Sequence, residues 1–118
     1  MVFGIYQVPR TKRLLTMAIK SEISDNGKTL KISIEGRFDA SSLDDFRRAY
    51  EDVDSNSLET YYVDLGKTVH LDSSALGMLL VLRDFAGGDN ARITIDNCSP
   101  EVKKIFAISS FEQLFTIQ

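Results

Sequence analysis

The chain has 118 residues, the length of one typical domain, and 43% of them are hydrophobic and 26% charged, as in an ordinary soluble globular protein. Its 17 acidic residues outnumber its 14 Lys and Arg residues, so the formal net charge is −3, which argues against direct nucleic-acid binding. One cysteine, Cys98, and one histidine, His70, exclude an intrachain disulfide, a cysteine-rich zinc site and a two-histidine metal centre.

A lone thiol fits a reducing compartment. No apolar run approaches the roughly 20 residues that a membrane span needs. Residues 1–16 mix apolar and basic side chains and lack a continuous apolar run followed by a small-residue cleavage site, so they are a poor secretory signal. We therefore expect a cytoplasmic protein with no membrane association.

Met17 offers a second plausible start of the chain. We interpret residues 1–16 as an N-terminal extension, consistent with an upstream translation start, and residues 17–118 as the folded domain. An ordered N-terminal arm is the alternative, and the sequence leaves both open.

Residues 19–36 predict a β-hairpin, because two segments that alternate apolar and polar residues flank Asp25-Asn26-Gly27. Residues 38–53 predict a helix with a capping serine, an acidic first turn and one apolar face. The residues concerned are the candidate caps Ser41 and Ser42, the acidic Asp44 and Asp45, and the apolar Leu43, Phe46 and Tyr50.

The second half of the chain alternates strands and helices. Residues 60–66 and 91–96 predict buried strands, and residues 71–88 predict a helix that ends at Gly87-Gly88. Ser99-Pro100 predicts an N-cap and a first-turn proline for a helix in residues 101–108, and residues 111–118 predict a short turn or helix and a final extended piece. The order β-β-α-β-α-β-α favours a layered α/β domain with a partly parallel sheet.

The helix in residues 75–86 is unusually apolar. At 100° per residue its apolar side chains span about 260°, against the roughly 100° that a surface helix needs. Either the helix lies deep in the core, or one apolar face packs on the sheet while the other, near the N-terminal end, meets a partner. We assign Leu76, Gly77 and Met78 to such a partner-binding surface.

Asp72, Ser73 and Ser74 precede this helix, where Asp or Ser is a common N-cap. A serine at a helix start also suits phosphorylation, because the helix dipole favours a phosphate there. An added charge of about −1.5 to −2 within an apolar docking surface would oppose association, and the carboxylate of Asp72 would add to it. The segment therefore contains the parts of a binding switch.

The stretch VDLGKTVHLDSSALGMLLVLRDFAGG resembles the signature of STAS domains, the anti-sigma factor antagonist family. EGRFDASS resembles the upstream element of that family, and ARITIDNCSPEVKKIFAISSFEQLF resembles its C-terminal half. The resemblance covers about residues 17–118. It implies a single STAS-like α/β domain with a mixed β-sheet and helices packed mainly on one face.

The resemblance also implies the roles of four residues. Ser73 matches the phosphorylated serine, and Ser74 matches the following Ser or Thr, which we expect to cap the helix or support Ser73. Asp72 matches the aspartate of the motif, and Asp39 matches the aspartate that lies near the phosphosite and the partner in this family. The chain stops soon after Phe115, so the final helix of the family is expected to be shortened.

The partners implied are GHKL-type serine kinases, which act as anti-sigma factors, and PP2C-type phosphatases. Unphosphorylated, the chain is expected to sequester the kinase and free a sigma factor, and phosphorylated on Ser73 it is expected to release the kinase. Transcription is then regulated by partner switching.

The sequence lacks the phosphate-binding patterns GxxxxGK[ST] and GxGxxG, so ATP, metal and base are assigned to the kinase and no cofactor to this chain. A hydrolase would combine Ser73 with His70 and Asp72, but these lie nearly consecutively, and a triad needs its groups to converge in space. We therefore expect no enzymatic activity. The alternative function is a small-ligand or nucleotide-binding module, or a scaffold of a signalling assembly, without reversible phosphorylation.

Overall fold

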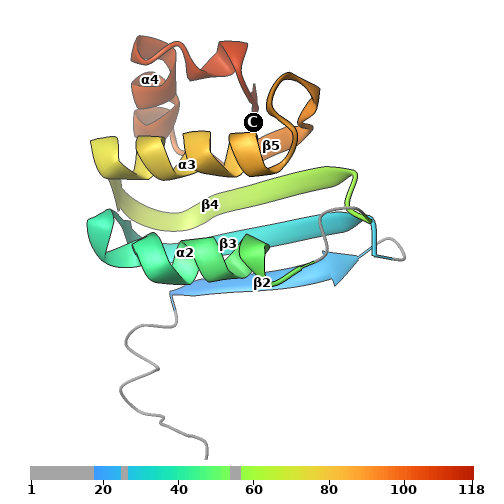
Figure 1. Cartoon of the computed structure of the whole chain (residues 1–118). Helices are drawn as coiled ribbons and strands as arrows, with labels where there is room; N and C mark the ends of the chain where they lie inside the picture. The colour runs from blue at the N-terminus through green and yellow to red at the C-terminus, as the bar shows by residue number, and fades with distance from the viewer. Residues whose placement is uncertain (1–17, 25–26, 54–56) are drawn as a thin grey trace, which may run out of the picture.

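The computed structural model describes residues 18–24, 27–53 and 57–118, which form a five-stranded sheet and three α-helices (Figure 1). The strands are β2 (Ile19–Ser24), β3 (Thr29–Phe38), β4 (Thr60–Leu71), β5 (Ile93–Asp96) and β6 (Thr116–Ile117). The helices are α2 (Leu43–Glu51), α3 (Ser73–Phe85) and α4 (Pro100–Ile108), with short 3₁₀ turns η1 (Ala40–Ser42), η2 (Gly88–Asn90) and η3 (Phe111–Gln113). Residues 1–16, interpreted above as an extension, lie outside the described residues.

The sheet order is β2-β3-β4-β5-β6, with β2 antiparallel to β3 and the remaining pairs parallel. Each parallel pair is therefore joined by a helical crossover between neighbouring strands. Because such crossovers are right-handed and the strands follow one another in order, all three helices are carried to the same face of the sheet (Figure 1). The prediction of a mixed sheet with helices mainly on one face is confirmed.

The two faces of the sheet differ in chemistry because strand side chains alternate between them. The helix-covered face carries the buried apolar residues Leu30, Ile32, Ile34, Tyr61, Val63, Leu65, Ile93 and Ile95. The opposite face is polar, and there the ammonium of Lys31 lies 3.7 Å from the carboxylate of Asp64. The hydrophobic core thus lies between the sheet and one layer of helices.

Strand β4 runs to Leu71 and β3 to Phe38, beyond the predicted ends at residues 66 and 36. The pairing of β3 with β4 shifts register between Ser33 and Glu35 and again between Gly36 and Arg37. Such bulges break the two-residue alternation by which a strand is recognised. The alternation of apolar and polar residues therefore stops before the pairing of β3 with β4 does. The additional paired residues extend both strands to the start of the following helical segments.

Most of the turn and cap predictions are confirmed. Strands β2 and β3 pair antiparallel on either side of Gly27, whose φ of +87° favours glycine, while Asp25 and Asn26 lie outside the described residues. The Ser99 hydroxyl accepts a hydrogen bond from the Val102 N–H at 3.2 Å at the start of α4, one residue before Pro100.

The prediction that Ser41 or Ser42 caps the helix in residues 38–53 is confirmed in position only, because Ser42 is the N-cap residue of α2 but its side chain makes no hydrogen bond to that helix. The side chain of Asp39 accepts from the Ser41 N–H and so caps the turn η1, and the Ser42 hydroxyl accepts from the Asp39 N–H at 3.5 Å and completes a capping box there. A full 3₁₀ turn separates the end of β3 from α2, which moves the start of the regular helix to Leu43.

Helix α3 has a buried apolar face and an exposed apolar face. Its buried residues are Ala75, Met78, Leu79 and Leu82. Leu80 and Val81 are 40% and 54% exposed, although they adjoin the buried Leu79 and Leu82 in the sequence. Of the two interpretations of this helix, the wholly interior one is excluded. No helix in the described part of the chain is long and apolar enough to cross a membrane.

The two faces of α3 predict unequal costs for the same substitution. Leu79→Ala removes a fully buried side chain and is expected to lower the free energy of unfolding by about 2–5 kcal/mol. Leu80→Ala is the matched control and is expected to cost less than about 1 kcal/mol. Urea unfolding of the two variants measures both values, and equal costs would contradict the assignment of the faces.

Candidate functional site

Two neighbouring parallel strands end side by side and place two aspartates together. Phe38 of β3 pairs with Leu71 of β4, so the next residues, Asp39 and Asp72, leave the same edge of the sheet. Both aspartates have extended backbones, with φ of −146° and −128°, and both precede a helical segment. The parallel register, acting between residues 33 apart in the sequence, therefore builds the site.

The two aspartates cap their helical segments in the same way. One carboxylate oxygen of Asp72 accepts hydrogen bonds from the Ser74 N–H at 3.0 Å and from the Ser74 hydroxyl. One carboxylate oxygen of Asp39 accepts from the Ser41 N–H at 3.0 Å and from the Ser41 hydroxyl. The sequence pattern Asp-x-Ser thus produces twin N-caps, and Asp72, rather than Ser74, caps α3.

Ser73 is the exposed residue within the cap of α3. Its hydroxyl makes no hydrogen bond with any residue that the structure describes, whereas the hydroxyl of the half-buried Ser74 is held by Asp72. His70 is exposed near the end of β4, and within the described segments it makes no hydrogen bond to Ser73. The Ser73 oxygen is therefore open to a reagent from outside the chain.

Both aspartates are ionised at neutral pH. The pKa of Asp72 lies below its ordinary value chiefly because the Ser74 hydroxyl donates to the carboxylate, and the negative charge of Asp39 opposes this shift. The pKa of Asp39 is lowered first by the Ser41 hydroxyl and then by Arg37, whose Nε lies 3.0 Å from the carboxylate. Ser73 thus adjoins in sequence a carboxylate that itself lies close enough to a second one to respond to its charge.

The three helix residues assigned to the partner surface lie in different environments. Gly77 is exposed, Leu76 is half-buried against the core, and Met78 is buried. Sequence analysis missed Leu80 and Val81, which are exposed large hydrophobic residues of α3. Spacing offered one signal, because Gly77 and Val81 are four residues apart and share a helix face.

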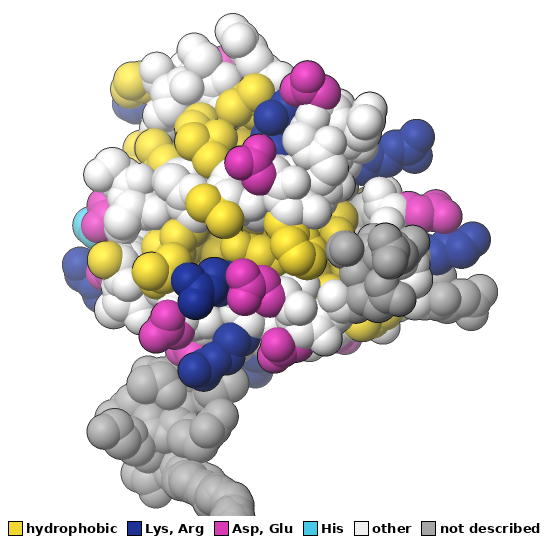
Figure 2. Space-filling model, viewed as in Figure 1, with side chains coloured by type: hydrophobic (Ala, Val, Ile, Leu, Met, Phe, Trp, Pro, Cys, Tyr) yellow, Lys and Arg dark blue, Asp and Glu magenta, His cyan; other side chains and the backbone are white. Residues whose placement is uncertain are grey.

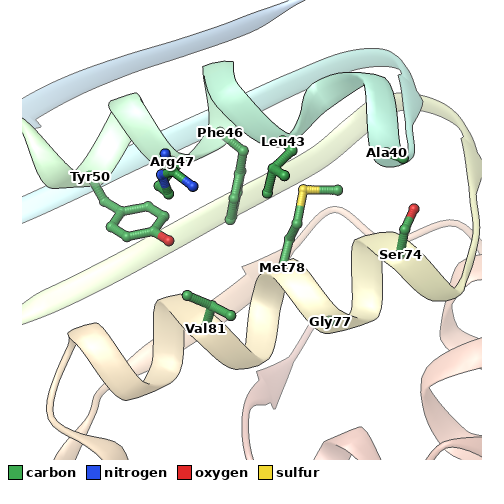
Figure 3. A pocket seen from close by; sticks show the side chains of 9 residues that line it. All are labelled: Ala40, Leu43, Phe46, Arg47, Tyr50, Ser74, Gly77, Met78 and Val81. Carbon is green, nitrogen blue, oxygen red and sulfur yellow. The ribbon is translucent and has the colours of Figure 1, made fainter.

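An apolar groove of about 400 Å³ lies between α2 and α3 (Figure 3). The space-filling view shows its hydrophobic side chains at the surface between the two helices (Figure 2). The groove is lined by Ala40, Leu43, Phe46, Arg47, Tyr50, Ser74, Gly77, Met78 and Val81. One end of it therefore reaches Ser74, the neighbour of Ser73.

The remaining reactive groups lie elsewhere. Cys98 is half-buried, its thiol lies 3.7 Å from the carbonyl oxygen of Ile95, and burial raises its pKa to about 11, so it is protonated at neutral pH. No group of three or more His, Cys, Asp or Glu side chains that could hold a metal ion occurs within residues 18–24, 27–53 and 57–118.

The cap of α3 predicts a pH-dependent stability. Asp72→Ala removes the capping acceptor and is expected to lower Tm by several degrees, and Asp72→Asn, which keeps an acceptor, by less. Because the pKa of Asp72 is lowered on folding, its charge stabilises the fold above the ordinary value of 3.8, and this contribution is lost as the pH falls through the folded-state pKa. Thermal unfolding of wild type and Asp72→Asn should therefore converge in acid, and a constant gap would contradict the role of the charge.

Comparison with known proteins places these features in a family. Residues 21–116 match the family model described as MlaB, STAS domain. A STAS-domain containing protein of Pseudomonas aeruginosa strain UCBPP-PA14 is 58% identical over 101 residues, which cover 86% of this chain and 99% of that protein.

Solved structures of low sequence identity share the fold. The anti-sigma factor antagonist SpoIIAA in its unphosphorylated form is 19% identical with a TM-score of 0.64, over 86% of this chain and 87% of that one. The Bacillus cell fate determinant SpoIIAA in the phosphorylated form is 18% identical with a TM-score of 0.63, over 86% and 91%. With the family match over residues 21–116, these findings show that the chain belongs to the STAS domain family.

Proposed function

We propose that the chain is an anti-sigma factor antagonist, a binding module without enzymatic activity that is switched by phosphorylation of Ser73. The observation that carries the proposal is the exposed Ser73 hydroxyl, unpartnered among the described residues, at the start of a helix whose outer face is apolar. Support comes from SpoIIAA, which shares this fold and whose solved structures include an unphosphorylated and a phosphorylated form.

The surface around Ser73 suits binding only while it is unphosphorylated. Docking against the exposed apolar side of α3 requires that both surfaces lose water. A phosphate adds a charge of about −1.5 to −2 beside the carboxylates of Asp72 and Asp39, and this charge resists desolvation. The helix dipole favours the phosphate at this position, so the fold tolerates it while the complex does not.

The partner proposed is a GHKL-type serine kinase, which supplies ATP, metal and base. The Ser73 oxygen attacks the γ-phosphorus of ATP, and the bond between that phosphorus and the β–γ bridging oxygen breaks, so ADP leaves. The proton of the Ser73 hydroxyl passes to a base of the kinase. A PP2C-type phosphatase would reverse the modification by hydrolysing the phosphoester. In this scheme the unphosphorylated chain holds the kinase in the cytoplasm and frees a sigma factor, and transcription follows.

The domain boundaries proposed for this module are residues 17–118, with residues 1–16 as an extension. The family match over residues 21–116 is consistent with that division. The module needs no cofactor in this scheme, because every group that acts on ATP belongs to the kinase.

The site of modification is tested by mass spectrometry of the intact chain after incubation with purified candidate kinases and ATP. Wild type and Ser41→Ala should each gain one phosphate, and Ser73→Ala should gain none. Ser41→Ala is the matched control, because Ser41 lies in the twin cap and is also exposed. Phosphate on Ser73→Ala would disprove the assignment, and no phosphate on the wild type would favour the ligand-binding or scaffold function.

The switch itself is tested by measuring kinase affinity. Ser73→Ala should bind the kinase as tightly as the unphosphorylated wild type, whereas Ser73→Asp should bind at least about tenfold more weakly, because it adds a charge to the docking surface. Calorimetric titration with the purified kinase gives both values. Equal affinities of the two variants for the kinase would contradict the proposed switch.

A further inference from the structure

The groove between α2 and α3 has a buried floor and an open mouth. Phe46, Tyr50 and Met78 form the floor, with exposed fractions of 1%, 2% and 5%. Leu43 of α2 and Val81 of α3 stand at the mouth and are 45% and 54% exposed (Figure 3). A concave apolar surface of this kind is typical of a binding site rather than of a solvated helix pair.

Gly77 lines this groove from the interior of α3, a position where glycine lowers helix stability relative to alanine. A Cβ atom added at Gly77 would meet nothing within 4 Å. Among the described residues, packing within the chain therefore gives no reason for a glycine here. A glycine is explained if another molecule must approach the helix backbone closely at this point.

Tyr50 provides an independent observation. Its ring is packed between Phe46 and Phe85, with centroid distances of 5.6 and 5.0 Å, so the residue is almost fully buried. Its hydroxyl nevertheless forms no hydrogen bond within the described residues and points into the groove (Figure 3). The ring is buried, but the hydroxyl oxygen is not itself shut off from solvent, so it is available to a group that enters the groove.

The occupant must be mainly uncharged. Arg47 is the charged residue of the lining, and its guanidinium lies 3.5 Å from the carboxylate of Glu51. A charge brought onto the floor would therefore lose water without gaining a partner there. An apolar side chain with a hydrogen-bonding group within reach of Tyr50 fits both observations.

The length of the groove suits a helix. Ser74 and Val81 lie seven residues apart on α3, which corresponds to about 10 Å, or two helical turns. An amphipathic helix that presents apolar residues at positions i, i+4 and i+7 spans the same distance. The Ser74 end adjoins Ser73, so a protein that acts on Ser73 lies next to the groove.

We infer that the groove between α2 and α3 receives an amphipathic helix of the serine kinase, which crosses Gly77 closely, inserts apolar side chains over Phe46 and Met78 and hydrogen-bonds to the Tyr50 hydroxyl. This inference rests on the proposed function, since it names the surface by which the same kinase docks. The groove supplies affinity, and Ser73 at its end supplies the phosphate acceptor.

The test titrates the full chain with the purified kinase that phosphorylates Ser73. Gly77→Leu places a side chain in the open groove without a clash within the chain, and it should weaken kinase binding at least about tenfold. It should also raise KM for phosphorylation of Ser73 more than it lowers kcat. Tyr50→Phe keeps the ring and should weaken binding about three- to tenfold. Lys104→Leu adds a leucine to an exposed site on α4 and is the matched control, with unchanged binding expected.

Gly77→Ala separates docking from folding, because it should raise Tm while weakening kinase binding. Unchanged binding of Gly77→Leu while Ser73 is still phosphorylated would overturn the groove and leave the proposed function intact. If analytical ultracentrifugation shows that the wild type is a homodimer and that Gly77→Leu is not, the occupant of the groove is a second copy of this chain. That result would overturn the kinase helix as the occupant. If no kinase modifies Ser73 in the wild type, the proposed function fails and the kinase helix fails with it.

Discussion

The parallel pairing of β3 with β4 is the constraint on which the rest of the site depends. It holds Phe38 beside Leu71, and the chain that leaves both strands at that edge has to start two helices next to each other. The carboxylates of Asp39 and Asp72 satisfy the free N–H groups at those starts. The exposed serine, its acidic surroundings and the groove between the helices all follow from this one register.

The division of α3 into two apolar faces connects the fold with binding. Leu79 and Leu82 secure the helix to the sheet, and Leu80 and Val81 leave apolar area in contact with water. Contact of this apolar area with water is unfavourable in free energy, and burial against a partner surface would remove that contact. Among the described residues, the opposite face of the sheet carries the Lys31–Asp64 pair and the exposed Tyr62, so the more apolar helix layer is the side suited to docking.

Local patterns predicted much of the fold. Gly27 marked a turn and Ser99-Pro100 a helix start correctly, because each acts on backbone within a few residues of itself. The ends of β3 and β4 were missed because bulges in their pairing break the alternation. The residue that caps α3 was left open between Asp72 and Ser74, since either side chain can accept the same N–H, and only the three-dimensional structure distinguishes them.

The groove was not predicted, because it needs two helices from distant parts of the sequence to lie side by side. The apolar arc of residues 75–86 did indicate that α3 has more than one apolar contact, but not which neighbour provides it. Nothing in the residues around Tyr50 in the sequence indicates that its hydroxyl points into the groove (Figure 3). Long-range placement of this kind has no signature in a short window of sequence.

The twin caps differ by a single oxygen atom at their exposed position. Where the cap of α3 has Ser73, the cap of η1 has Ala40, and both residues face solvent in otherwise matching turns. An enzyme that recognises the shape of this turn therefore meets two similar targets on one molecule and finds a hydroxyl at the position of Ser73 on only one. The proposed stoichiometry of one phosphate per chain is thus explained by serine at one cap and alanine at the matching position of the other.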